Sequence, residues 1–373
     1  MHRRGNLLAL SFVFAMTLSG CGGGHGGSAP SGESVVPQVD TGSTVTMQSD
    51  TNVGDAIVLQ GLWVANGTNV VEFTPFSFPA GVFDAPPHHV INSPVFAAPQ
   101  GVQFDSRNNL WVIDGGTPPS KKPALYEFTS TQLSHLGTNN HPLPFRTIKS
   151  SLFKFIQQGV FRNGNFWVTD DGANLVDEFT PAQLAVGGAN VTPRTIIQSF
   201  PAFNGPLGIA FGANGNMWIA NNNTTTLFEF KAPLPTFGRQ TLRPDVVLRN
   251  KGGSIEGPWA LVFDARGNLW SSNANSPDTV VEFLHAQILK SGAPVPAITI
   301  FPALDKGFLT LSAPNGIAFN TSGDLGAISS AAPFGAAVYD PPFHSGAVLP
   351  EHLFVGPRTT LNAPAGDTYG PVF

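Results

Sequence analysis

The 373-residue chain has a single cysteine, Cys21, and few charged side chains. One cysteine cannot close a disulfide within the chain, and beyond position 21 no thiol is present for nucleophilic catalysis or metal binding. Charged residues make up 12% of the sequence, against about a quarter in an average globular protein. The basic residues form no patch with interleaved aromatic side chains, so we expect no nucleic-acid partner.

Long apolar runs are also missing. No segment has the roughly 20 consecutive apolar residues of a transmembrane helix. The apolar run at residues 7–18 is about half that length; it follows Arg3 and Arg4 and ends at Leu18-Ser19-Gly20-Cys21. A basic start, a short apolar stretch and small residues before a cleavage point are typical of a secretory signal peptide.

The four residues that end at Cys21 resemble the lipobox of bacterial lipoproteins. The resemblance implies that residues 1–20 are a signal peptide and that Cys21 carries the lipid. Acyl chains would then hold the protein on a membrane without a helix that crosses it. Position 22 is Gly and not the Asp that resembles an inner-membrane retention signal, so we expect a cell-envelope location, at the outer membrane if the source is Gram-negative. The alternative is a plain secretory signal with an unmodified cysteine.

Residues 21–54 are rich in Gly, Ser, Thr and other small polar residues. Such a composition buries too little apolar surface to fold, which predicts a flexible tether. His25 within this segment is interpreted as a spacer residue.

Beyond the tether, one pattern recurs six times with a period of about 50 residues, typical of a propeller or a solenoid. A copy has a polar residue (Gly61 in the first copy), an apolar segment around a tryptophan position, and a polar residue three positions after it. The tryptophan position is occupied by Trp63, Trp111, Trp167, Trp218, Trp270 and, in the sixth copy, Gly326.

The fourth copy illustrates the strands that each repeat predicts. Apolar segments at 208–211 and 217–221 flank Ala-Asn-Gly-Asn, whose residues adopt positive φ readily and predict a hairpin. Further β segments follow at 227–230 and 245–248. Four antiparallel strands per repeat make one propeller blade.

The two chain ends complete the count of blades. The first copy lacks its opening strand, whereas the chain ends on an unpaired apolar segment at 369–373. We therefore predict an all-β, six-bladed β-propeller over residues 55–373, in which N- and C-terminal strands close one blade and leave no open sheet edge. A solenoid would carry capping repeats instead. We expect a monomer.

The repeat has a recognisable relative. Gly-Ile-Ala-Phe, Asp-x-x-Gly-Asn-Leu-Trp and Val-x-Glu-Phe resemble NHL repeats, and the segment 178–184 is similar to a variant in bacterial NHL-type proteins. The resemblance covers about residues 55–373 and implies the propeller fold. It leaves the activity open, because function depends on sites and not on the fold.

Two sets of polar residues recur in the repeats. The position three after each tryptophan is expected on one face of the propeller, either as a rim for a ligand or as a hydrogen-bond partner of its own turn. The candidates for a ligand face at this position are Asp114, Asp170, Asn221 and Asn273. The third strands of five copies carry a glutamate, which indicates a repeated contact within the blade and not one catalytic acid.

Residues at the entrances of the inner strands break the repeat and surround the predicted central channel. They are Gln100, Gln157, Leu207, Glu256, Asn315 and Asp367. Gln100 and Gln157 are further candidates for the ligand face. Glu256-Gly-Pro-Trp and Pro-Asn315-Gly-Ile-Ala-Phe resemble the metal-binding motifs of gluconolactonase (regucalcin-like) propellers. The resemblance implies calcium or magnesium held by Glu256, Asn315 and Asp367, with the ion polarising a lactone carbonyl.

The sequence departs from that family in two ways. The family's glutamate opens the first blade, whereas Glu256 lies in the fifth, and no aspartate matches the family's general acid. The alternative interpretation is that these are polar residues at solvated channel mouths.

We therefore predict a propeller that binds a protein or glycan ligand through one face, without catalysis and without a cofactor. The alternative function is a metal-dependent lactonase or lyase at the channel. His88 and His89 fall near an outer strand, and no histidine is placed for general-base work at the channel. Because the sixth copy has lost its tryptophan and its third-strand glutamate, we expect a site between this copy and the fifth, near Glu256.

Overall fold

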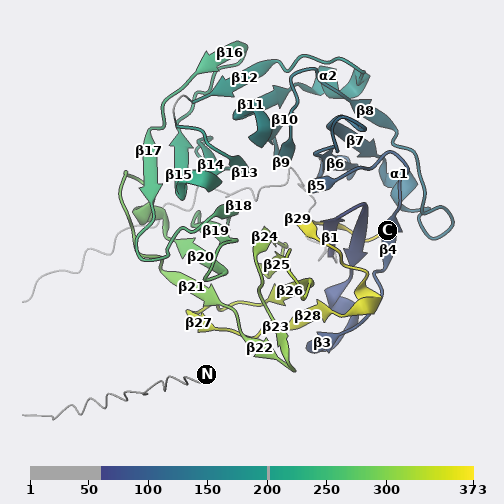
Figure 1. Cartoon of the computed structure of the whole chain (residues 1–373), viewed down its shortest axis with the longest axis vertical. Helices are drawn as coiled ribbons and strands as arrows, with labels where there is room; N and C mark the ends of the chain where they lie inside the picture. Colours follow the sequence, from purple (N-terminus) through teal and green to yellow (C-terminus); the bar gives the residue numbers. More distant parts are fainter. Residues whose placement is uncertain (1–59, 200–201) are drawn as a thin grey trace, which may run out of the picture. The chain divides into compact units, whose positions relative to one another are not determined.

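The computed structural model describes residues 60–199 and 202–373, and the predicted signal peptide, Cys21 and the predicted tether lie outside the described residues. The described residues form six sheets arranged as blades around a central axis (Figure 1). The predicted six-bladed, all-β propeller is thus confirmed.

Each blade has four antiparallel strands, which follow one another from the axis outward. Blades one to three are β29 (Pro364–Pro371), β1 (Gln60–Asn66), β2 (Asn69–Phe73) and β4 (His89–Ile91); β5 (Pro99–Phe104), β6 (Leu110–Asp114), β7 (Ala124–Phe128) and β8 (Arg146–Ile148); β9 (Ile156–Arg162), β10 (Asn165–Asp170), β11 (Leu175–Phe179) and β12 (Thr195–Gln198). Blades four to six are β13 (Pro206–Phe211), β14 (Met217–Asn221), β15 (Thr226–Phe230) and β17 (Val246–Arg249); β18 (Pro258–Phe263), β19 (Leu269–Asn273), β20 (Thr279–Phe283) and β21 (Ile298–Phe301); β24 (Pro314–Phe319), β25 (Leu325–Ser329), β26 (Gly335–Tyr339) and β28 (His352–Val355).

Blade one is built from both ends of the described chain. The C-terminal β29 is its innermost strand and pairs antiparallel with β1, with Tyr369 opposite Leu62. The strand begins at Pro364, earlier than the predicted start at 369, because Pro364 pairs with Asn66 across a bulge. The predicted closure of one blade by the two terminal strands is confirmed.

Short polar motifs form the hairpin between the first two strands of a blade. In blade five, Asp264 Oδ1 accepts from the backbone N–H of Arg266 (2.9 Å) and of Asn268 (2.8 Å), and Gly267 takes the positive φ of 78°. The Asp264 Oδ2 atom accepts from the Trp270 indole N–H at 3.2 Å. The Asp-x-x-Gly-Asn-x-Trp pattern therefore encodes a turn and the position of the tryptophan ring beside it.

The core lies between neighbouring blades. The tryptophan of one blade packs edge-on against the phenylalanine that ends the inner strand of the next blade, with ring centroids 5.7 Å apart for Trp63 and Phe104 and 5.6 Å apart for Trp270 and Phe319. These tryptophans are fully buried. Aromatic pairs at this distance stabilise beyond their buried area by about 0.5–1.5 kcal/mol, so each blade depends on its neighbour.

A feature absent from the sequence prediction runs around the perimeter. The loop before the outer strand of one blade pairs parallel with the outer strand of the preceding blade, through β16 (Gly238–Thr241), β27 (Gly346–Ala347) and β3 (Gly81–Phe83). Single bridges at Ile148–Gly188 and Leu248–Gly292 repeat this contact. Three blades therefore have a fifth strand, which covers the outer edges of blades three, five and six.

The remaining elements are short. The hairpin of β22 (Leu304–Asp305) and β23 (Phe308–Leu309) precedes blade six. The helices α1 (Ser130–Leu133) and α2 (Pro181–Val186) each start at a threonine–glutamine capping box. The described residues also contain five 3₁₀ turns: η1 (Pro75–Ser77), η2 (Asp171–Ala173), η3 (Asn222–Thr224), η4 (His285–Gln287) and η5 (Pro357–Thr359). Within these ranges, no helix has the length and apolar character needed to cross a membrane.

Candidate functional site

The third-strand glutamates belong to a hydrogen bond that four blades repeat. In blade five the amide of Asn268 donates to Glu282 Oε1 at 2.8 Å. The matching asparagine–glutamate distances are 3.0, 2.6 and 2.7 Å in blades two, three and four. These glutamates are buried, so they hold two strands together, as their recurrence predicted.

The candidates for a ligand face lie inside the blades. Asp114 is 1% exposed and accepts from the backbone N–H groups of Ala97, Ala98 and Gly116 at 2.7–3.0 Å. Asp170, Asn221 and Asn273 are fully buried and accept in the same way from the loop that leads into the inner strand. These four side chains therefore hold the loops of one face in place. They are buried beneath the loops and do not form a rim for a ligand.

The channel residues lie on inner strands from opposite sides of the ring. Gln100, Gln157, Asn315 and Asp367 belong to β5, β9, β24 and β29. The Gln158 side-chain amide donates to the carbonyl of Asn315 at 3.3 Å, which joins blade three to blade six across the axis. At the height of Gln158 and Asn315, opposite sides of the channel are therefore within hydrogen-bond distance of each other.

Several polar atoms along these inner strands are buried without a hydrogen-bond partner among the described residues: Gln157 Oε1, Trp259 Nε1, Asn315 Oδ1 and both carboxylate oxygens of Asp367. Burial raises the pKa of Asp367 well above the usual range of an aspartate. Burial thus works against the ionised form that a metal ligand would need.

The three residues with gluconolactonase-like motifs are only partly brought together. Asn315 and Asp367 lie on adjacent inner strands, and a Cβ added at Gly316 would lie 2.2 Å from Asp367 Oδ1. Glu256 lies instead in the loop that precedes β18, where its carboxylate accepts from the Asn250 amide. Its backbone N–H donates to Asn273 at 3.1 Å, so this loop is tied to its own blade.

Blade six opens a hollow toward blade one. It carries Asp324, Gly326 and Val338 at the positions where four other blades carry the asparagine, the tryptophan and the glutamate. Tyr369 of β29 stands where the other inner strands end in phenylalanine, 3.2 Å from a Cβ added at Gly326. The missing indole therefore leaves a space that Tyr369 fills only in part.

The hollow between blades six and one has a volume of about 280 Å³, against about 160 Å³ at the equivalent place between blades two and three, where Trp111 is present. Its lining includes Gln60, Phe76, Phe78, Asp324, Glu351 and Tyr369. Aromatic rings, carboxylates and an amide thus converge on a space close to the lower size of ligand pockets, about 300 Å³. A site beside the altered sixth blade was predicted toward blade five; the structure places this hollow on the other side.

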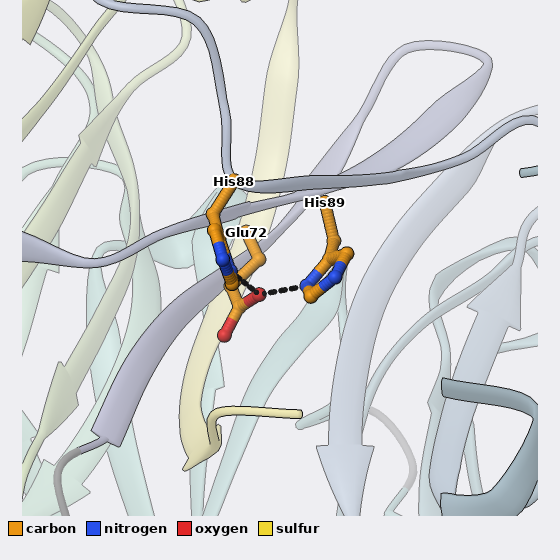
Figure 2. A group of neighbouring side chains, drawn as sticks. All are labelled: Glu72, His88 and His89. Atoms are coloured by element: carbon orange, nitrogen blue, oxygen red, sulfur yellow. Dashed lines mark hydrogen bonds and ion pairs between the residues drawn. The ribbon is translucent and has the colours of Figure 1, made fainter. Parts of the chain in front are cut away.

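Blade one holds a second cluster, which the sequence prediction missed. Figure 2 shows Glu72 of β2 beneath the imidazoles of His88 and His89, which both point at its carboxylate. Glu72 Oε2 lies 3.1 Å from His88 Nδ1 and 2.6 Å from His89 Nδ1. Within residues 60–199 and 202–373, this is the one group of three His, Cys, Asp or Glu side chains close enough to share an ion.

The sequence holds a signal for this cluster. Blade one keeps the third-strand glutamate but has Gly61 where four blades have its asparagine partner. Blade one therefore differs from the repeat in two visible ways: its glutamate lacks the asparagine partner, and two histidines lie at the predicted outer strand. The pairing of β2 with β4 places His89 directly opposite Glu72.

No protein-family model and no curated protein sequence matches this chain. Solved structures match it across the propeller, with high coverage and low identity. A periplasmic gluconolactonase of Pseudomonas aeruginosa is 12% identical with a TM-score of 0.52, covering 84% of this chain and 99% of that one.

Two further neighbours support the same fold. A Bacteroides caccae protein of unknown function is 8% identical with a TM-score of 0.51, covering 83% of this chain and 98% of that one. A chain of the nidogen/laminin complex is 12% identical with a TM-score of 0.52, covering 83% and 98%. At these identities the likeness establishes the propeller fold alone.

Proposed function

We propose that this protein is a lipid-anchored cell-envelope binding protein whose propeller takes a glycan ligand in the hollow between blades six and one. One observation carries the proposal. Blade six has Asp324, Gly326 and Val338 in place of the asparagine, the tryptophan and the glutamate of the repeat, and the hollow opens at these positions. Elsewhere the repeat fills the equivalent space with tryptophan.

The lining suits a sugar unit. A sugar ring has apolar C–H faces and hydroxyl edges, and the hollow offers Phe76 and Phe78 for the faces and Asp324, Glu351 and Gln60 for the hydroxyls. Phe76 is 42% exposed, so an aromatic ring stands at the mouth without a partner that buries it.

The test restores bulk at the mouth of the hollow. Thr321 and Ser106 are exposed residues at equivalent turn positions, beside the wide hollow of blade six and the narrow one of blade two. We expect Thr321→Trp to weaken binding of envelope glycan fragments at least tenfold by calorimetry, because the indole would cover the opening, while Ser106→Trp binds as the wild type does.

Two results would overturn the proposal. Equal glycan binding by both tryptophan variants would place the site elsewhere. Turnover of a lactone by the wild-type protein that is lost in Asp367→Asn would instead favour the alternative, metal-dependent lactone chemistry at the channel, which the unpartnered oxygens of Asn315 and Asp367 support.

A further inference from the structure

The carboxylate of Glu72 has changed partners relative to the other blades. Where four blades donate an asparagine amide to this glutamate, blade one has Gly61, and a Cβ added there would lie 2.2 Å from Glu72 Oε1. The Glu72 carboxylate thus occupies space that an asparagine would need. Its Oε1 atom is buried and has no hydrogen-bond partner among the described residues.

The outer strand supplies the replacement. In blades two and three the residue opposite the glutamate is Arg146 or Thr195, each of which donates to it. In blade one this residue is His89, and His88 before it turns to the same oxygen (Figure 2). The His89 ring is held in place by stacking on Trp63, with centroids 6.5 Å apart and planes 13° apart.

Exposure within the cluster is graded. The side chain of Glu72 is 0% exposed, that of His89 is 12% exposed and that of His88 is 43% exposed. A fully buried carboxylate normally needs a cation or several donors. Here both imidazoles face Oε2, which leaves Oε1 unsatisfied. A cation that enters from the His88 side would satisfy the carboxylate.

We propose that Glu72, His88 and His89 bind a divalent transition-metal ion, with zinc as the best match. Two imidazole nitrogens and one carboxylate oxygen are a ligand set that zinc takes, at about 2.0–2.2 Å from each ligand atom. The three ligand atoms lie within 4.8 Å of one another. The ion lies between the two Nδ1 atoms and Oε2, each ligating imidazole carries its proton on Nε2, and water takes the fourth position on the exposed side.

The site is separate from the glycan hollow and does not depend on the proposed function. Glu72 pairs with Trp63, whose ring packs toward Phe104 of blade two, whereas the hollow lies between blades one and six. A bound ion would tie β2 to the segment that enters β4, in the blade that closes the ring.

The test is a titration of the purified protein with zinc salt alone. We expect the wild type to bind one equivalent and to melt a few degrees higher when zinc is present, because a ligand of the folded state stabilises it by mass action. Gly61→Asn restores the residue that four blades carry and returns the glutamate to its amide partner. This variant should fold normally and bind zinc at least tenfold more weakly, as should His89→Ala.

A matched control removes histidines elsewhere. His135 and His141 are exposed side chains of the loop after α1, so the double variant His135→Ala/His141→Ala should keep the full zinc stoichiometry and affinity. The absence of zinc binding by the wild type would overturn the proposal. So would undiminished binding by folded Gly61→Asn, with folding checked by circular dichroism.

Discussion

Asp177 is an acidic residue at a position where the other blades carry none. It is fully buried in β11, and neither carboxylate oxygen has a hydrogen-bond partner among the described residues. The equivalent position in the other blades is apolar: Val71, Tyr126, Phe228, Val281 and Ala337. Burial, reinforced by the nearby charge of Asp170, raises the pKa of Asp177 to about 8.

This raised pKa makes stability depend on pH. The unfolded chain loses the Asp177 proton near pH 3.8, whereas the folded protein holds it to about pH 8. Its contribution to stability is therefore complete below the unfolded pKa and is lost as the pH rises through the folded one. We expect Asp177→Val to raise the free energy of unfolding by several kcal/mol more at pH 8 than at pH 4, because valine has no carboxylate that would have to ionise in the core.

Denaturant unfolding at several pH values measures the difference. Asp177→Asn serves as the control, because it removes the titration but keeps a buried polar group. Both variants should lose the part of the pH dependence between pH 4 and 8 that the wild type shows. An unchanged pH profile in both would show that Asp177 does not titrate in this range.

At the scale of elements, β29 supports the whole ring. It supplies the inner strand of blade one, lies beside β5 and β24, and places Tyr369 against blade six. Removing it would expose the edge of β1 and open the ring between two blades. Its loss therefore affects the contact of every blade with its neighbour.

We expect truncation after Ala363, which deletes β29, to remove the cooperative fold. The free energy of unfolding of a domain is about 5–15 kcal/mol, and the deletion costs several buried side chains together with one complete strand pairing. Limited proteolysis and thermal melting measure the outcome. Deletion of residues 372–373 alone, which follow the strand, should leave a cooperative transition, and a cooperative transition in the longer deletion would contradict the role of β29.

The perimeter pairings belong to the same scale. Strands β16, β27 and β3 have between two and four residues. Segments this short carry almost no periodicity, so the sequence does not reveal them. They exist because each loop passes along the outer strand of the preceding blade, where unpaired backbone groups are available.

At the scale of the whole molecule, the anchor is a proposal for residues outside the described part of the chain. The proposed lipidation of Cys21 predicts that labelled palmitate is incorporated when the full chain is expressed in a bacterial host. Cys21→Ser should abolish the labelling and release the protein from the membrane fraction, because the chain has no other cysteine. Labelling that persists in this variant would refute the site.

The losses of the asparagine, tryptophan and glutamate gather in blade one, which the chain ends close, and in the neighbouring blade six. Blade six has lost the tryptophan, the glutamate and the asparagine, and blade one has lost the asparagine. The glycan hollow and the proposed zinc site both follow from these losses. Blades two to five carry the full set of repeat residues. Comparison with them shows where a missing side chain leaves a space, as at Gly326, or a group without its partner, as at Glu72.

The sequence by itself determined the fold, because the asparagine and the tryptophan two positions later recur in all four regular blades. In blades two and five an aspartate, Asp105 or Asp264, also holds the hairpin and the indole within a few residues of itself. It also indicated the closure, since an unpaired apolar segment at the end needs a partner strand. Only the tertiary structure decided on which side of blade six the hollow opens, because that depends on Tyr369 meeting Gly326. It likewise decided that His88 and His89 share one oxygen of Glu72, and that Gln158 reaches Asn315 across the axis. Contacts of that kind depend on the orientation of side chains brought together by blade packing, and a one-dimensional pattern does not specify it.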